Sequence, residues 1–268
     1  MPVRFPRRGP RIVHAQSLTL AVAGAALLAP TTLPAGTHRD RPQAHARRVE
    51  WREGPVSAVD LLAEVRDCAR VSRGRYRSDN GAPAKIPICG TDDAVFWKAD
   101  MDIDCDGRPG SRCNRRTDPH FSASTSYAQS NGRPLNAERL PFIVVPAPSR
   151  IWDYRDHGVG GGSVVAVVYR DRVRYAVVGD TGPRNIIGEA SYATAKALGI
   201  RPDPHGGGAR SGVTYIVFKN ARVSPIEDRA AAVATGERLA REFVDRPDGV
   251  TGRQRRAGNP GMTPEARE

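Results

Sequence analysis

The motifs that identify many enzyme classes are missing from this 268-residue sequence. It contains no G-x-S-x-G, no H-E-x-x-H, no P-loop and no strand-linked G-x-G-x-x-G. The sequence therefore gives no support for an α/β-hydrolase, a zinc protease, a P-loop NTPase or a dinucleotide-binding enzyme. His120, His157 and His205 lie in polar or glycine-rich loops, where we expect solvated residues or the edge of a substrate site rather than metal ligands.

Aromatic residues are scarce as well, at 6%, and this changes how the net charge of +12 is interpreted. A nucleic-acid surface needs clustered basic residues with stacking aromatic rings, and only residues 73–77 approach that pattern. Residues 1–49 carry eight arginines and one aspartate, so most of the excess charge belongs to this leading segment. We therefore expect no nucleic-acid partner.

The beginning of the chain has the layout of an export signal. Four arginines precede an apolar run at residues 18–28, which is too short to span a bilayer. We expect residues 1–35 to be a signal peptide, cleaved after Ala35 or after Ala46, and residues 36–54 to be a flexible lead-in. The mature protein would then be secreted, with no membrane contact.

Only four cysteines are present, and in an exported chain they meet oxidising conditions. Their sequence allows three disulfide connectivities. We favour Cys68–Cys89 with Cys105–Cys113, because short loops limit backbone distortion. Neither pair has the spacing of a zinc knuckle, and no histidine lies between them, so we expect no metal and no cofactor.

The clearest structural signal is a β-hairpin. Two β-rich runs, residues 160–169 and 172–179, flank the polar pair Arg170-Asp171. The first run is apolar at every position after Ser163, which indicates a sheet or barrel covered on both faces. Further strands are predicted at residues 94–106, 140–146 and 213–218, and helices at residues 56–71, 191–198 and 225–243.

Two carboxylates, Asp180 and Glu189, stand nine residues apart around a loop shaped by glycines and a proline. Glycoside hydrolysis needs one carboxyl group to protonate the leaving oxygen and a second to activate water or attack carbon. A folded loop of this length can bring two such groups to opposite sides of one bond. The alternative is structural: Asp180 begins a turn and Glu189 caps a helix.

Four further acids, Asp100, Asp102, Asp104 and Asp106, occupy alternate positions and would share one face of an extended chain. An EF-hand is excluded, because Cys113 stands where a bidentate glutamate is needed. Three interpretations stay open. The row could hold calcium in a looser site, it could attract a polycation such as an amino-sugar polymer, or it could cap turns around a disulfide.

Several segments together resemble the chitosanases of glycoside hydrolase family 75, known from fungi and actinobacteria. The resemblance covers about residues 88–220 and rests on residues 99–107, Asp118-Pro119, residues 135–138, 161–167, 178–183 and 187–191. It implies hydrolysis of β-1,4 links between glucosamine units with inversion. The essential aspartate and glutamate of that family fall on Asp180 and Glu189.

The arrangement of strand, Asp-Thr-Gly, loop, acid and helix also resembles the double-psi β-barrels of expansins, family 45 cellulases and membrane-bound lytic transglycosylases. We expect a mainly β fold with a few helices, built on a six-stranded double-psi-like β-barrel core. A disulfide-stabilised N-terminal part and a C-terminal helix complete it. The catalytic domain would span residues 55–222, followed by a helix at residues 223–245 that the family pattern does not cover and a disordered tail at residues 246–268.

The resemblance thus predicts a secreted, monomeric endo-chitosanase whose partner is chitosan. The related barrels suggest Glu189 as the acid and Asp180 as the base, although a carboxylate at a helix N-terminus is stabilised in its ionised form. We expect the four-aspartate row, Thr181 and Tyr192 to contact substrate. The alternatives are an expansin-like barrel that binds wall polysaccharide without cutting it, and a lytic transglycosylase acting on peptidoglycan.

Overall fold

The computed structural model describes residues 55–246. The expected signal peptide, the lead-in and nearly all of the expected tail lie outside this range. The described elements are α1 (Ala58–Glu64), β1 (Cys89–Gly90), β2 (Ala94–Asp104), β3 (Phe142–Pro146), η1 (Tyr154–His157), β4 (Ser163–Tyr169), β5 (Arg172–Gly182), β6 (Glu189–Ser191), α2 (Tyr192–Leu198), β7 (Ala209–Arg222) and α3 (Arg229–Val244). Within these residues, none of the helices combines the length and apolar character needed to cross a membrane.

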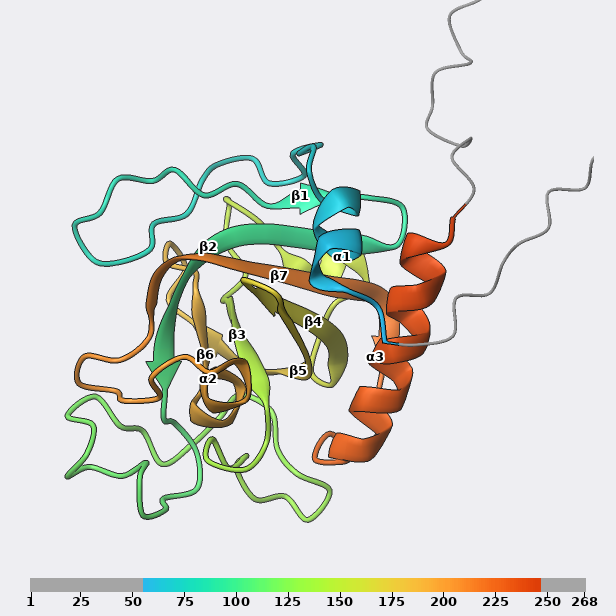
Figure 1. Ribbon diagram of the computed structural model, residues 1–268. Helices are drawn as coiled ribbons and strands as arrows, with labels where there is room; N and C mark the ends of the chain where they lie inside the picture. Colours follow the sequence, from blue (N-terminus) through green and yellow to red (C-terminus); the bar gives the residue numbers. More distant parts are fainter. Residues whose placement is uncertain (1–54, 247–268) are drawn as a thin grey trace, which may run out of the picture. The chain divides into compact units, whose positions relative to one another are not determined.

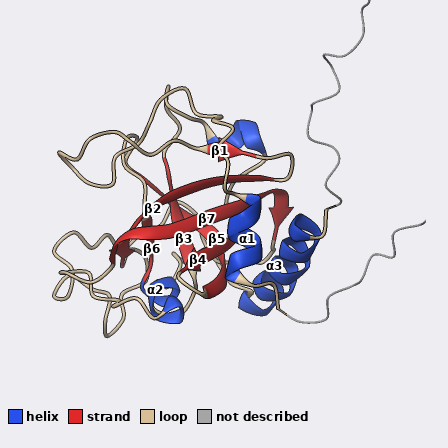
Figure 2. Cartoon of the chain, turned by 45° about the horizontal axis from the view of Figure 1, so that its top comes forward, coloured by secondary structure: helices blue, strands red, loops and turns tan. Residues whose placement is uncertain are grey.

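Six strands close into a β-barrel in the order β2, β6, β3, β5, β4 and β7, and β7 pairs back onto β2 (Figure 1). The pairs β2/β6 and β3/β5 are parallel, and the other neighbours are antiparallel. Strand β1 pairs only with β2 and stands outside the closed ring. The three α-helices pack around this ring, as Figure 2 shows. The expectation of a mainly β protein with a six-stranded barrel is confirmed.

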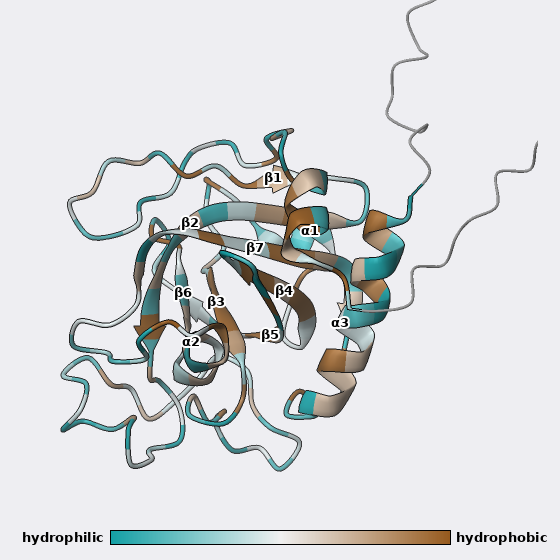
Figure 3. Cartoon of the chain, viewed as in Figure 1, coloured by the Kyte–Doolittle hydropathy of each residue, from teal (hydrophilic) through white to brown (hydrophobic). Residues whose placement is uncertain are grey.

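Apolar side chains cover both faces of the strands, and this explains the unbroken apolar pattern of β4. Its residues alternate between two buried clusters: Val164, Ala166 and Val168 enter one cluster, and Val165 and Val167 enter the other. The hydrophobic segments coloured brown in Figure 3 follow the same strands. Burial on both faces supplies the free energy that holds the barrel closed.

The C-terminal helix α3 belongs to the first of these clusters. Its buried residues Ala232, Ala240 and Phe243 pack with strand residues, and the ring of Phe243 meets that of Phe218 edge-on at 6.0 Å. The helix begins later than predicted, because Asp228 caps it by accepting a hydrogen bond from the backbone N–H of Ala231.

The other local predictions hold in part. Strands β4 and β5 form the expected hairpin, with Tyr169 paired to Arg172, and α2 ends at Gly199 in the left-handed conformation that glycine adopts easily. The predicted helix at residues 56–71 is wrong in length, because α1 ends at Glu64.

Both predicted disulfides are present, with the favoured connectivity. Cys68–Cys89 ties the segment after α1 to β1, and Cys105–Cys113 ties the end of β2 to the loop that follows it.

A buried hydroxyl joins β3 to the start of α2. Ser191 is fully buried; its Oγ accepts a hydrogen bond from the backbone N–H of Phe142 at 3.0 Å and donates to the carbonyl of Leu140 at 2.9 Å. The same oxygen caps α2 through the N–H of Thr194. Two buried backbone groups and one helix end therefore depend on one side chain.

Replacing Ser191 with alanine should lower the free energy of unfolding by about 2–4 kcal/mol, because buried donors and acceptors lose their partner. Urea denaturation of the purified variant measures this. Ser124→Ala is the matched control, since Ser124 is exposed, and we expect a change within about 0.5 kcal/mol. Equal stability losses in the two variants would contradict this account of Ser191.

Candidate active site

A cleft of about 830 Å³ opens at one face of the strands β2, β6, β3 and β5. Loop segments at residues 78–80, 118–120 and 203–207 complete its walls. Among the described residues that line it, none is lysine or arginine. Eight are acidic: Asp79, Asp102, Asp104, Asp106, Asp118, Asp180, Glu189 and Asp203.

Asp180 faces this cleft because of a β-bulge in β5. Ile143 of β3 pairs with Val178, but the next residue, Val144, pairs with Asp180, so Gly179 is an extra residue on β5. A side chain at Gly179 would meet Phe142, whose Cβ lies 2.6 Å from the position of an added Cβ. Glycine is therefore needed at the bulge that directs Asp180 toward the cleft.

Two backbone N–H groups hold the carboxylate of Asp180. Its Oδ1 accepts hydrogen bonds from Ser126 at 2.8 Å and from Thr181 at 2.7 Å. The hydroxyls of Ser126 and Thr181 are bonded to each other at 2.6 Å, which fixes the two segments together. Both backbone donors use Oδ1, so neither of them occupies Oδ2.

Glu189 reaches the same face from β6. Burial, followed by the negative charges of Asp102, Asp106, Asp180 and Asp100, raises the pKa of Glu189 to about 7. Its strand partner is Asp102. The carboxyl group of Glu189 lies against Gly182, where an added Cβ would stand 2.7 Å from Oε2. Glu189 therefore holds a proton at a pH where an exposed glutamate has lost it.

Val144 separates the two acids. Strand β3 lies between β5 and β6, with Val144 paired to Asp180, while the neighbouring residue Ile143 pairs with Ala190. Asp180 and Glu189 thus stand two strands apart on one face, which places their backbones roughly 10 Å from each other. Both side chains line the cleft, one on each side of Val144.

The concern that a helix N-terminus would keep Glu189 ionised is removed by the structure. Glu189 is the first residue of β6, and α2 begins only at Tyr192, with Ser191 as its N-cap. Burial and neighbouring carboxylates therefore determine the state of Glu189.

The four-aspartate row is divided. Asp102, Asp104 and Asp106 line the cleft, whereas Asp100 is only 7% exposed and does not line it. Asp104 accepts a hydrogen bond from the N–H of Asp106, and Asp106 accepts one from Ser122. Burial raises the pKa of Asp104 well above its usual range.

Of the other two expected substrate contacts, Thr181 lines the cleft and Tyr192 does not. Tyr192 lines a neighbouring hollow with Arg112 and Arg116. This hollow shares Asp203 and His205 with the cleft.

Asp118 and Asp203 were not predicted to line the cleft, and each begins a copy of the tripeptide Asp-Pro-His. In Asp118-Pro119-His120 and in residues 203–205, the aspartate Oδ1 accepts the N–H of the histidine, at 2.8 and 3.0 Å respectively. Both turns line the cleft, so His120 and His205 lie at its edge. The repeated tripeptide is visible in the sequence and could have linked the two loops. His157 lies instead beside Trp152, with 5.9 Å between the ring centroids.

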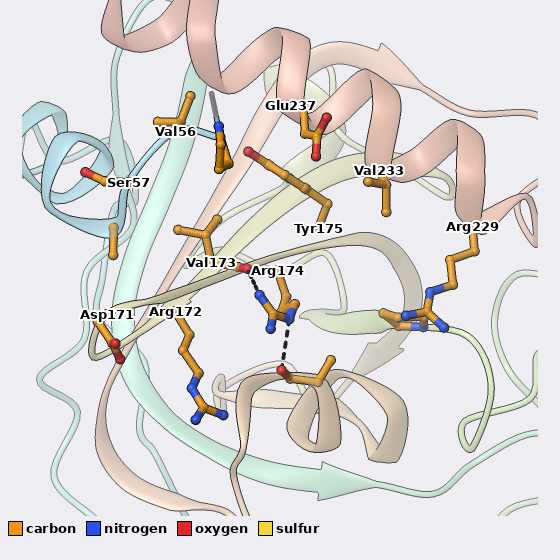
Figure 4. A pocket seen from close by; sticks show the side chains of 14 residues that line it. Val56, Ser57, Asp171, Arg172, Val173, Arg174, Tyr175, Arg229, Val233 and Glu237 are labelled. Carbon is orange, nitrogen blue, oxygen red and sulfur yellow. Dashed lines mark hydrogen bonds between the residues drawn. The ribbon is translucent and has the colours of Figure 1, made fainter. Parts of the chain in front are cut away.

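A second pocket, between β5, α1 and α3, has a different character (Figure 4). Its wall combines apolar residues with Arg172, Arg174 and Arg229. Arg174 donates to the carbonyl of Ala197. Arg172 donates to the carbonyl of Leu198, so these two arginines satisfy the C-terminal end of α2. None of the eight cleft acids lines this pocket.

Comparison with known proteins points to one family. The family model described as "Fungal chitosanase of glycosyl hydrolase group 75" matches residues 101–246. Endo-chitosanase C of Aspergillus oryzae is 32% identical over 129 residues, covering 47% of this chain and 31% of that protein. Endo-chitosanase B of Aspergillus oryzae (strain ATCC 42149 / RIB 40) is 30% identical over 176 residues, covering 59% of this chain and 73% of that protein.

The chain thus spans about a third of the length of the first of these relatives. Among solved structures, Streptomyces papain inhibitor matches 50% of this chain and 99% of its own, at 20% identity and a TM-score of 0.29, which is too low to support an argument.

The family match reaches residue 246 and so includes α3, which corrects the expectation that the family pattern ends near Arg222.

The proton on Glu189 should be directly observable. In protein carrying ¹³C-labelled glutamate, the side-chain carboxyl signal of Glu189 should titrate with a midpoint of about 7. Asp106→Asn removes one nearby negative charge, keeps an oxygen for the Ser122 hydrogen bond, and should lower this midpoint. Asp203→Asn is the control, because Asp203 is not one of the four charges that raise the pKa of Glu189. A midpoint near that of an exposed glutamate would contradict this description.

Proposed function

The chain belongs to glycosyl hydrolase group 75, the family of fungal chitosanases, and from this premise we propose that it hydrolyses the β-1,4 links between glucosamine units of chitosan. The observation that carries the proposal is the charge of the cleft. A chain with a net charge of +12 gathers eight acids around one cleft, with no lysine or arginine among the described residues that line it. Such a wall attracts a polycation and repels an anionic polymer.

The composition of the cleft also indicates how the polymer is held. Its lining includes no tyrosine, tryptophan or phenylalanine among the described residues, so stacking on sugar rings is not its main means of recognition. Asp102, Asp104 and Asp106 follow the line of β2 and extend beyond its end. We assign this row, with Thr181, to contacts with successive sugar units and their ammonium groups. Tyr192 and Asp100 are not assigned a direct contact.

The mechanism that we propose is a single displacement with inversion. Glu189 protonates the glycosidic oxygen, while Asp180 removes a proton from the water that attacks the anomeric carbon from the opposite face. Inverting enzymes keep their carboxyl groups roughly 6.5–9.5 Å apart, which suits two acids on alternate strands. The raised pKa of Glu189 suits the acid, since its carboxyl must carry a proton when the bond breaks.

The assignment to the whole protein includes its location. We propose that residues 1–35 direct export and that the protein acts as a secreted monomer. Two disulfides in one small barrel suit an oxidising environment. We also propose residues 55–222 as the catalytic domain, with the helix at residues 223–245 as part of the same folded unit, since α3 packs on β4 and β5.

Substitution of either acid should abolish catalysis. Asp180→Asn and Glu189→Gln should each lower kcat on chitosan by about 10²–10⁴-fold, measured as reducing ends released. Azide should partly restore Asp180→Ala, and a substrate with a good leaving group should partly restore Glu189→Ala. Asp156→Asn, an exposed acid outside the cleft, should retain wild-type kcat.

Three outcomes would change the assignment. Near-normal rates in both acid variants would refute catalysis by this pair. Dependence on Glu189 alone would favour a lytic transglycosylase, which needs one carboxyl group. Binding of chitosan with no reducing ends released by the wild-type protein would favour an expansin-like binding barrel.

The acidic wall predicts a strong dependence on substrate charge. KM for chitosan should rise several-fold between about 0.05 and 0.5 M salt, because added ions screen the attraction between carboxylates and ammonium groups. The fully N-acetylated polymer carries no ammonium group and should be cut poorly at every salt concentration. A KM for chitosan that does not change with salt would refute recognition by charge.

A further inference from the structure

Three carboxylates come together at the edge of the cleft, apart from the catalytic pair. One oxygen from each of Asp79, Asp100 and Asp102 lies within 4.8 Å of the other two. Asp100 and Asp102 project from the same side of β2, and Asp79 comes from the loop that follows residue 77. We call these three residues the aspartate trio.

Asp100 is the unusual member of the aspartate trio. Its side chain is 7% exposed, and its Oδ1 is buried without a hydrogen-bond partner. Gly188 leaves room for this oxygen, since an added Cβ there would stand 2.2 Å from it. A buried carboxylate oxygen without a partner is costly, so a group that pairs with it would stabilise the fold.

Within the described part of the chain, these charges have no cationic side chain as a partner. Within residues 55–246, neither lysine nor arginine forms an ion pair with any member of the aspartate trio. The hydroxyl of Ser78 donates a hydrogen bond to Asp79 but carries no charge. Among the described residues, the trio therefore has no positively charged partner.

We propose that Asp79, Asp100 and Asp102 bind a divalent cation that prefers oxygen ligands, with Ca²⁺ as the best fit. Ca²⁺ takes carboxylate oxygens in flexible geometry, whereas Zn²⁺ sites in proteins are built mainly from histidine and cysteine. A sugar ammonium group can reach Asp102 from the cleft, but it is a poorer fit for all three carboxylates together, because the ring that carries it would have to follow it to the buried Asp100. The proposal revises the expectation of no metal and takes up, for Asp100 and Asp102, the looser calcium site that the sequence left open.

The bound ion would tie the wall of the cleft to the barrel. Residues 78–80 line the cleft, and just before them Arg77 is bonded to the segment that leads to Glu189: its N–H donates to the carbonyl of Asn185, and its carbonyl accepts the N–H of Ile187, both at 3.0 Å. Binding of Asp79 to an ion held by β2 adds a second attachment for the same loop.

Calorimetry on the chelator-treated full-length protein tests this without polysaccharide, so the result is independent of the proposed catalytic activity. We expect one Ca²⁺ per chain by isothermal titration. The melting temperature should rise by roughly 3–6 °C in 10 mM Ca²⁺ relative to NaCl of the same ionic strength. Asp79→Asn and Asp100→Asn should each weaken binding tenfold or more. Asp203→Asn, which removes a cleft acid outside the trio, should bind Ca²⁺ as the wild type does.

The isosteric Asp100→Asn removes a buried negative charge, so the variant should fold and melt without Ca²⁺ at or above the wild-type temperature. The proposal fails if Ca²⁺, Mg²⁺ and Mn²⁺ give neither heat nor a melting shift. It also fails if the trio variants bind as tightly as the wild type, since the ion then lies elsewhere. A melting shift caused by glucosamine hydrochloride but not by Ca²⁺, and lost in Asp100→Asn, would identify a sugar subsite instead.

Discussion

Gly179, the extra residue at the bulge in β5, determines the direction in which the side chain of Asp180 points. Side chains alternate between the two faces of a strand, so without the bulge at Gly179, Asp180 would pair with Val145 and enter a buried apolar cluster. A carboxylate in that position would cost several kcal/mol or lose its charge. Glycine is compatible with the bulge because Phe142 fills the space that a side chain would occupy. A chain without this bulge could build the barrel but not the cleft.

The register of the neighbouring strands aligns Asp180 with residues on the next three strands of the barrel. The parallel pairing of β5 with β3, followed by the pairing of β3 with β6 and of β6 with β2, aligns Asp180, Val144, Glu189 and Asp102 in one row. Ser191 fixes this row from behind through its hydrogen bonds to β3 and α2. The relative positions of Asp180 and Glu189 are therefore set by backbone pairing and not by the loop that joins them in sequence.

Features set by local sequence could be predicted, whereas features set by the pairing of distant segments could not. The apolar run of β4, the turn at Arg170-Asp171 and the end of α2 at Leu198 are local properties, and each was predicted. The spacing of Asp180 and Glu189 left a structural interpretation open, and only the family resemblance favoured catalysis. Burial of Asp100 and the placement of Asp79 could not be read from the sequence, because both depend on a distant loop folding over β2.

The cleft brings many carboxylates close together, and the ammonium groups of its proposed substrate would neutralise their negative charge. Carboxylates around Glu189, together with burial, keep its proton bound near pH 7 in the free protein. If ammonium groups of a glucosamine polymer bind beside Asp102 and Asp106 as proposed, the negative potential at Glu189 would fall, and Glu189 would release its proton more easily. In the proposed mechanism, the negative charge that attracts the polymer also keeps Glu189 protonated until the polymer binds. Substrate recognition and proton transfer would then depend on the same aspartates. A neutral, acetylated sugar would bind weakly, and it would not lower the negative potential at Glu189, so proton donation would also be slower.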